Sequence, residues 1–386
     1  MTPHLSPRRL LVIALLALLA SACSTPDNSE PPAPLTEIDG AMAVDRLWSL
    51  DSGEGAAHGF VNLRPLLLAD KIYTIDAEGL VQRVDAIEGV VEWSHETGLR
   101  AAAGLAGRND SLIATSVDGD LVRLDMSEDG LVEVWRHSVK SEIRNRAVLV
   151  ENQVFLRTVD GKLFAFDFND GKVLWNVSRR VPPLSLTGTS HPAVVGDLVL
   201  GGFDNGKLVA FERKTGSAIW ESSIGVPTGR SEIERLVDLD GQFLVRDGLV
   251  YVSSFQGNLA AIVISSGQIL WSRDFSSFQA MDADSDALYL TDERSHVWSV
   301  DRRTGTAFWK QDALNARKLT APRLLGDTIV VADLEGYVHF LDKRDGRLVA
   351  RASTGGERYI SQPLVVGDST IVLDSAGRLT ALSRPQ

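Results

Sequence analysis

The chain has 386 residues, of which 44% are hydrophobic and 23% are charged, a balance typical of an ordinary globular protein rather than a disordered or membrane-spanning one. Acidic side chains outnumber basic ones by 51 to 39, and the formal net charge of −12 argues against nucleic acid or an anionic bilayer surface as the main partner. The single cysteine excludes an intramolecular disulfide and a zinc site built on a cysteine cluster.

The first segment has the organisation of an export signal. Arg8 and Arg9 precede an unbroken apolar run, residues 10–20, which is long enough for a signal-peptide core and too short to span a bilayer. Small residues then precede Cys23. This arrangement resembles the lipobox of bacterial lipoproteins, which implies that residues 1–22 are removed and that Cys23 is lipidated. Ser24 is not the Asp that favours inner-membrane retention in this class, so the resemblance implies the outer membrane, on its periplasmic face.

Residues 23–43 separate this signal from the rest of the chain. They are rich in Ser, Thr, Pro, Asp, Asn and Glu and contain few apolar side chains. Such a composition cannot bury enough surface to order itself, so it predicts a flexible tether behind the lipidated cysteine. The folded domain is then expected to span residues 44–386.

From Trp48 onward, three markers recur at intervals of about 40 to 50 residues, which indicates a repeat architecture. They are a polar turn that opens an alternating strand, a Gly-x-apolar-x-x-apolar strand, and a Gly followed a few residues later by Trp. Six segments carry the last marker: Gly89–Trp93, Gly130–Trp135, Gly171–Trp175, Gly216–Trp220, Gly267–Trp271 and Gly305–Trp309. Each repeat therefore holds about four short strands joined by hairpin turns, with almost no helical periodicity.

A four-stranded unit of this size cannot cover its own hydrophobic faces, and radial stacking covers them while leaving only short edges. Residues 44–386 accommodate eight repeats of about 43 residues, which predicts an all-β fold, an eight-bladed β-propeller of four-stranded antiparallel blades. One blade-ending strand is missing from the repeats. The segment Asp45–Ser49 resembles Lys172–Asn176, so we expect the strand around Trp48 to complete the blade built by residues 363–383 and to close the ring.

No catalytic or metal site emerges from the residue pattern. The seven histidines are scattered without metal-ligand spacing, and no Ser-His-acid or paired-carboxylate arrangement can be assembled. Asp282, Asp284, Asp286 and Glu293 have the spacing of a calcium loop, but Ala287 replaces its turn glycine. We therefore predict no metal, no cofactor and no enzymatic activity.

Segments such as Ala210–Trp220 and Val300–Trp309 are similar to the A-x-D-x-x-T-G-x-x-x-W motif of the pyrroloquinoline-quinone repeat family. That family includes quinoprotein dehydrogenases, which hold their cofactor beneath a vicinal disulfide and by a calcium ion. The single cysteine excludes such a disulfide, so the resemblance implies inherited architecture without the cofactor.

The lipobox, the polar tether and the eight repeats together resemble the lipoprotein family of the outer-membrane β-barrel assembly machinery. Two stretches, Pro183–Ser190 and Gly229–Asp240, sharpen the resemblance. In that family these loops contact the periplasmic POTRA repeats of the central barrel protein BamA. The resemblance implies the following partner-binding residues: Leu184, Leu186, Thr187, Arg235, Asp238 and Asp240. Thr187 stands where the family usually has Arg.

The lengths of the connections point to the same two loops. The longest adjacent connections between a blade-ending Trp and the next polar turn run from Trp175 to Asp197 and from Trp220 to Asp247. Both leave a blade at the same strand and belong to consecutive blades, so we expect them to project side by side from one face. The leucines either fold back onto the blades or form a small apolar interface rimmed by charge, and the second arrangement is favoured.

The sequence thus favours a non-enzymatic periplasmic scaffold, anchored through Cys23, that docks its loop face on a BamA-like POTRA protein and aids insertion of outer-membrane proteins. A rival hypothesis is a periplasmic quinoprotein-like enzyme or small-ligand binder that uses the propeller channel. A third is a ring that holds outer-membrane β-barrel precursors by pairing the edge strand of a blade with an extended client.

Overall fold

The folded part of the chain consists of short strands joined by hairpins, between Arg46 and Ser383. The computed structural model describes residues 30–56, 62–127, 130–181, 190–225, 237–239 and 241–386. The chain divides into two units, Met1–Pro32 and Ala33–Gln386, and every strand that the structure describes belongs to the second. Within the described residues, no helix has the length and apolarity needed to cross a membrane.

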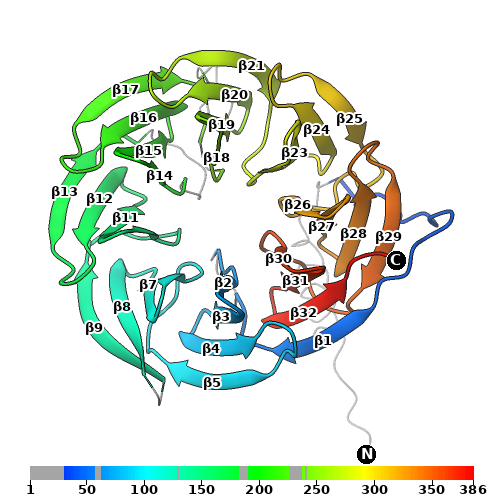
Figure 1. Ribbon diagram of the computed structural model, residues 1–386, viewed down its shortest axis with the longest axis horizontal. Coiled ribbons are helices and arrows are strands. Elements are labelled where there is room, and N and C mark those ends of the chain that lie inside the picture. The colour runs from blue at the N-terminus through cyan, green and yellow to red at the C-terminus, as the bar shows by residue number, and fades with distance from the viewer. Residues whose placement is uncertain (1–29, 57–61, 128–129, 182–189, 226–236, 240) are drawn as a thin grey trace, which may run out of the picture. The chain divides into compact units, whose positions relative to one another are not determined.

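The second unit is a closed ring of eight four-stranded sheets (Figure 1). The strands of blades 1 to 4 are β2 (Leu66–Leu68), β3 (Lys71–Ile75), β4 (Leu80–Asp85), β5 (Val91–Glu96); β6 (Ala106–Arg108), β7 (Ser111–Thr115), β8 (Asp120–Ser127), β9 (Gly130–Ser138); β10 (Val148–Val150), β11 (Gln153–Arg157), β12 (Lys162–Asp167), β13 (Val173–Ser178); β14 (Ala193–Val195), β15 (Leu198–Phe203), β16 (Lys207–Glu212) and β17 (Ala218–Ser223).

The strands of blades 5 to 8 are β18 (Leu244–Arg246), β19 (Leu249–Ser253), β20 (Gly257–Val263), β21 (Ile269–Phe275); β22 (Asp282–Ala283), β23 (Ala287–Thr291), β24 (Val297–Asp301), β25 (Ala307–Gln311); β26 (Arg323–Leu325), β27 (Thr328–Ala332), β28 (Tyr337–Asp342), β29 (Leu348–Ser353); β30 (Leu364–Val366), β31 (Ser369–Leu373), β32 (Arg378–Ser383) and β1 (Arg46–Asp51). Within each blade the innermost strand comes first and the outermost last.

The first strand of the chain closes the ring by joining the last blade. β1 pairs antiparallel with β32, with Trp48 opposite Ala381 and Ser49 opposite Thr380. Blade 8 therefore has the order β1-β32-β31-β30, whereas the other blades use strands that are consecutive in sequence. The predicted eight-bladed propeller and its closure by the Trp48 segment are both confirmed.

Aspartates fix the hairpin between the second and third strands of several blades. In blade 7, Oδ1 of Asp333 accepts hydrogen bonds from the backbone N–H groups of Glu335 at 2.9 Å and Tyr337 at 3.0 Å. Gly336 between them has φ +79°, a conformation that a side chain disfavours. Equivalent aspartates make the same pair of bonds in blades 1, 6 and 8: Asp76, Asp292 and Asp374.

The recurring Trp and Gly form a contact between neighbouring blades. Trp175 of blade 3 donates from Nε1 to the backbone oxygen of Arg213 in blade 4 at 2.8 Å. Gly216 of blade 4 lies against the same indole, and a Cβ placed on it would come within 2.7 Å of the ring. The Trp N–H makes this bond to the next blade at five positions: Trp135, Trp175, Trp220, Trp271 and Trp309. The Gly-to-Trp spacing therefore has a structural cause. The Gly of a blade packs against the Trp of the preceding blade, and the Trp a few residues later contacts the following blade.

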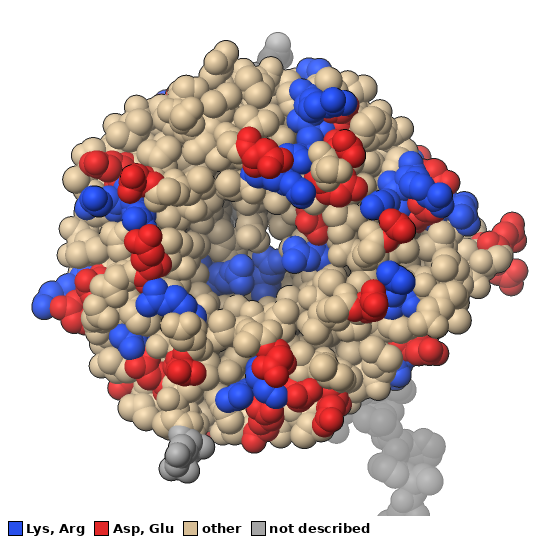
Figure 2. Space-filling view, in the orientation of Figure 1, with Lys and Arg blue, Asp and Glu red and all other residues tan. Residues whose placement is uncertain are grey.

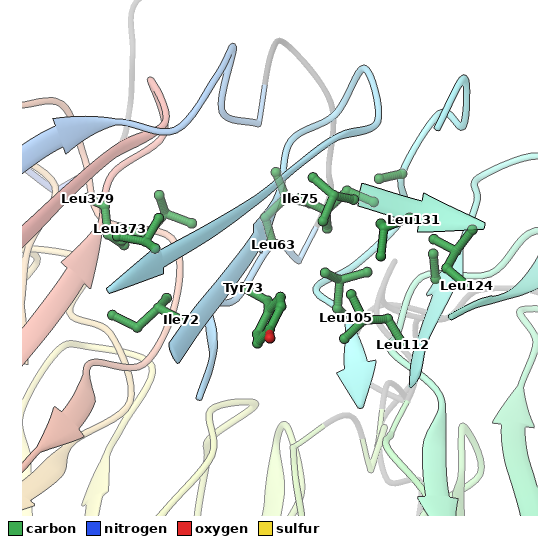
Figure 3. Close-up of a cluster of buried hydrophobic side chains, with 14 of the residues drawn as sticks. Leu63, Ile72, Tyr73, Ile75, Leu105, Leu112, Leu124, Leu131, Leu373 and Leu379 are labelled. Atoms are coloured by element: carbon green, nitrogen blue, oxygen red, sulfur yellow. The ribbon is translucent and has the colours of Figure 1, made fainter. Parts of the chain in front are cut away.

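The hydrophobic core lies between blades. The second strands of the blades are buried on both faces, so β3 and β7 are buried along nearly their whole length rather than at alternate residues. Figure 3 shows one cluster, in which Ile72 and Tyr73 of blade 1 lie between Leu373 of blade 8 and Leu112 of blade 2. Each interface contributes apolar burial that no single blade can supply.

Residues 33–43, which composition assigns to the tether, contact the outside of the ring. Ala33 and Thr36 accept hydrogen bonds through their backbone oxygens from Arg317 at 2.8 Å and Arg351 at 2.9 Å. The backbone N–H groups of Ala43 and Gln386 each donate to the other residue's oxygen at 3.1 Å. The stretch is held because its backbone groups find partners, a factor that side-chain composition does not report.

A buried polar network lies beneath this N-terminal arm, defined as residues 33–43. Asp333 accepts hydrogen bonds from Nε of Arg317 at 2.7 Å and from Nε2 of His339 at 2.9 Å, and Arg351 donates from Nε to Nδ1 of His339 at 3.2 Å. Burial lowers the pKa of His339, and the charges of Arg351 and Arg317 lower it further against the raising effect of Asp333. His339 is therefore neutral in the folded protein at neutral pH.

Candidate functional site

The two loops that the sequence singles out enter blades 4 and 5. The first connects β13 to β14 and the second connects β17 to β18. Because antiparallel strands alternate in direction, these connections lie at the same end of the ring as the hairpins between second and third strands. The roots of both loops are described, and they meet on blade 4.

The end of the first loop is anchored through a buried ion pair. Oγ of Ser190 donates to the backbone oxygen of Gly202 at 3.0 Å and accepts a hydrogen bond from Nη1 of Arg157 at 3.2 Å. Arg157, on β11 of blade 3, also pairs with Asp204 of blade 4. Both charged side chains are almost fully buried, so removing either partner would leave an uncompensated charge in the interior. This pair holds the loop root across the junction of blades 3 and 4.

The described end of the second loop contacts Asn205, which follows Asp204 in the same hairpin. Val237 forms a parallel bridge with Asn205, at the tip of the hairpin that joins β15 to β16. The backbone oxygen of Asp238 accepts a hydrogen bond from the N–H of Phe255 in blade 5 at 3.0 Å. Its described residues are therefore held between blades 4 and 5.

Gly202 brings the two roots together. A Cβ on Gly202 would lie 3.0 Å from Oγ of Ser190, 2.9 Å from Cβ of Leu239 and 2.7 Å from Cζ of Phe243. The first of these residues belongs to the root of the β13–β14 loop and the other two to the root of the β17–β18 loop. The predicted adjacency of the two loops thus holds for their described ends.

The sequence-predicted site residues fall mostly outside the described residues. This applies to Cys23, Leu184, Leu186, Thr187, Arg235 and Asp240. Asp238 is described, and its exposed fraction is 0%. Because the side chain is enclosed, any contribution of Asp238 to partner binding passes through the position of the loop root rather than through the outer surface.

One group of polar residues at this end of the ring escapes sequence reasoning. Arg64, Arg146, His191, Gln242 and Gln362 each precede the innermost strand of a blade by two residues. Figure 2 shows Lys and Arg side chains gathered inside the central hollow of the ring. Their common position, two residues before the innermost strand of a blade, is the sequence signal that could have identified them. It is weak because these residues differ in type and lie far apart in the sequence.

The described residues offer no ready-made metal centre. No cluster of three or more His, Cys, Asp or Glu side chains suitable for a metal ion occurs among them. Asp284, from the calcium-like spacing, instead accepts hydrogen bonds at Oδ1 from the backbone of Asp286 at 3.0 Å and Ala287 at 2.9 Å. Its carboxylate stabilises a turn between strands.

Comparison with known proteins gives consistent matches. A family model described as outer membrane protein assembly factor BamB matches residues 77–311. Proteins of that name from Alkalilimnicola ehrlichii and Yersinia pestis are 36% and 31% identical to the chain; the alignments cover 84% of this chain in both cases, and 83% and 86% of the relatives.

Solved structures show the same fold. BamB from Moraxella catarrhalis superposes with a TM-score of 0.79 at 24% identity, covering 88% of this chain and 100% of the other. A quinohemoprotein alcohol dehydrogenase from Comamonas testosteroni superposes with a TM-score of 0.71 at 12% identity, covering 89% and 78%. At these identities the likeness concerns the propeller architecture alone.

Proposed function

The chain belongs to the family of the outer membrane protein assembly factor BamB, and from this premise we propose that it is a non-enzymatic scaffold in the assembly of outer-membrane proteins. Its relatives are named as assembly factors rather than as enzymes. The scaffold is carried on the periplasmic face of the outer membrane by a lipid on Cys23.

The partner surface is formed by the β13–β14 and β17–β18 loops, and the partner is a POTRA-bearing BamA-like protein. The observation that carries this proposal is the shared root at Gly202, where Ser190 and Leu239 approach the same backbone position. A rigid base under two long neighbouring loops favours binding, because less conformational freedom is lost when a partner docks. Leu184 and Leu186 supply apolar contact, and Asp240 selects a basic partner surface.

The proposal is tested by co-purifying the POTRA protein with the full-length chain from solubilised outer membranes. Leu184→Ala combined with Leu186→Ala is expected to abolish most of the capture, and Asp240→Arg to weaken it. The matched control is Leu174→Ala with Ile219→Ala, because these side chains lie on the outermost strands of blades 3 and 4 and are 46% and 55% exposed. Undiminished capture by the loop variants, each still folded, would remove the interface assignment.

A separate variant addresses the buried position. Asp238→Asn keeps the size of the side chain while removing its charge, whereas Arg at this enclosed site would disrupt the root itself. Weaker capture by Asp238→Asn, with unchanged thermal stability, would indicate that the root orients the loop. Membrane anchoring is tested by fractionating Cys23→Ala, which is expected to be lost from the outer-membrane fraction.

A further inference from the structure

The five channel residues, Arg64, Arg146, His191, Gln242 and Gln362, occupy one position of the repeat. Each lies two residues before the innermost strand of its blade: β2, β10, β14, β18 and β30. Equivalent positions on a ring of blades converge on its axis, so side chains that start far apart in the sequence meet there (Figure 1). None of the five carries a carboxylate.

Arg64 crosses the channel. Its Nη1 donates to Oε1 of Gln242 at 2.9 Å, and its Nη2 donates to Oε1 of Gln362 at 2.6 Å. Gln242 belongs to blade 5, which lies opposite blade 1 in the ring, and Gln362 belongs to the adjacent blade 8. Nε2 of Gln362 donates in turn to the backbone oxygen of Pro322 at 2.7 Å. The guanidinium is thus held at the axis by neutral oxygens.

Among the described residues, positive charge accumulates here without a matching negative charge. Neither Arg64 nor Arg146 forms an ion pair within the part of the chain that the structure describes. Burial, followed by the positive charges of Arg146 and Arg323, lowers the pKa of Arg64 to about 9, and burial lowers the pKa of Arg146. Arg64 remains cationic at neutral pH, so the folded protein bears a cost of desolvation and like-charge repulsion.

His191 completes the arrangement as a neutral hydrogen-bonding group. Its exposed fraction is 6%, and neither ring nitrogen forms a hydrogen bond with a described residue. Burial lowers the pKa of His191 well below its usual range, and the charges of Arg146 and Arg64 lower it further against the raising effect of a contact with the backbone of Arg146. A neutral imidazole in this position has one N–H that can donate to a bound group.

We propose that Arg64, Arg146 and His191 form a binding site for a small oxyanion, a phosphate or carboxylate group, in the propeller channel. Two guanidinium groups and an imidazole N–H match the several acceptor oxygens of such a group, and guanidinium forks bind it through paired hydrogen bonds. The bound anion neutralises the channel charge and ties blades 1, 3 and 4 together. This inference does not depend on the proposed partner surface.

The test is isothermal titration of inorganic phosphate into the full-length protein at constant ionic strength set by chloride, with parallel titrations of sulfate and acetate. Saturable binding is expected for the wild type. Arg64→Gln and Arg146→Gln are each expected to weaken it by about tenfold or more, the typical worth of a charge-assisted contact. The matched control is Arg100→Gln, because Arg100 is 70% exposed and pairs only at the surface with Asp118.

Each outcome bears on the site. Loss of binding in both channel variants, with the wild-type affinity kept by Arg100→Gln, supports it, and the phosphate and acetate arms distinguish the two kinds of oxyanion. Equal affinity in the channel variants and the control would place the anion elsewhere and overturn the proposal. So would the absence of saturable binding of every oxyanion to the wild type. Near-UV circular dichroism confirms the fold of each variant, and Arg64→Lys, which keeps the charge but not the fork, is expected to bind with intermediate affinity.

Discussion

Gly216 offers a direct measurement of how tightly one blade fits against the next. Substitution by Ala places a methyl group within 2.7 Å of the Trp175 indole, closer than carbon atoms can approach. Gly196 in the same blade provides the control, because it also has a positive φ, 57° against 74°, and a Cβ there meets nothing within 4 Å. The pair therefore separates backbone strain from crowding.

The expected magnitudes follow from these two terms. A non-glycine residue in the left-handed region costs about 1–2 kcal/mol, which both variants share. Overpacking costs about 1–3 kcal/mol more, and only Gly216→Ala bears it. The free energy of unfolding is measured from the urea midpoint of tryptophan fluorescence, compared at a constant slope.

A further variant tests the cause of the difference. Trp175→Leu removes the indole that the new methyl group strikes, so adding Gly216→Ala to it should cost no more than Gly196→Ala does in the wild type. Such coupling between two positions is the signature of direct contact. If Gly216→Ala and Gly196→Ala lowered the stability equally, the explanation of the Gly-to-Trp spacing given above would be refuted.

Three further predictions concern the arm and the closure of the ring. Folding lowers the pKa of His339, so as the pH falls through about 6.5 the unfolded chain binds a proton at this histidine before the folded chain does, and the free energy of unfolding should decrease. His339→Gln should flatten this part of a profile of stability against pH measured by urea unfolding. An unchanged slope would contradict the assignment. Arg351→Ala removes the hydrogen bond to Thr36 and should speed limited proteolysis within residues 33–43 while the ring stays intact, so equal cleavage rates would argue against this clamp. Removal of residues 1–51 deletes β1 and exposes the edge of β32, so we expect aggregation on size-exclusion chromatography, and a monodisperse monomer would show that closure does not require β1.

The repeat could be predicted from sequence because its markers have local causes. The hairpin glycines need a positive φ, and the Gly-to-Trp spacing reflects one contact repeated around the ring. Closure by the Trp48 segment was also predictable, since one blade-ending strand was missing from the repeats. These predictions rest on markers that recur in several repeats and on the number of strands in each repeat, so none of them depends on a single residue.

Other features depend on contacts that a linear pattern does not contain. The burial of Asp238 follows from the meeting of two blades around its backbone. The docking of residues 33–43 rests on main-chain groups bound by Arg317 and Arg351, which composition cannot report. The proximity of Arg64 to Gln242 spans 178 positions and appears only when the blades are set in a circle.

The pairing of β1 with β32 has a consequence for how the protein matures. The first strand of the ring, β1, can pair only after β32 has been synthesised, because the paired residues lie more than 300 positions apart. Contacts of such long sequence separation form slowly, and until they form the open ring of blades exposes unpaired strand edges and apolar surface. Completion of the ring is therefore a late event in folding, and a chain that ended before Arg378 would lack the strand that pairs with β1.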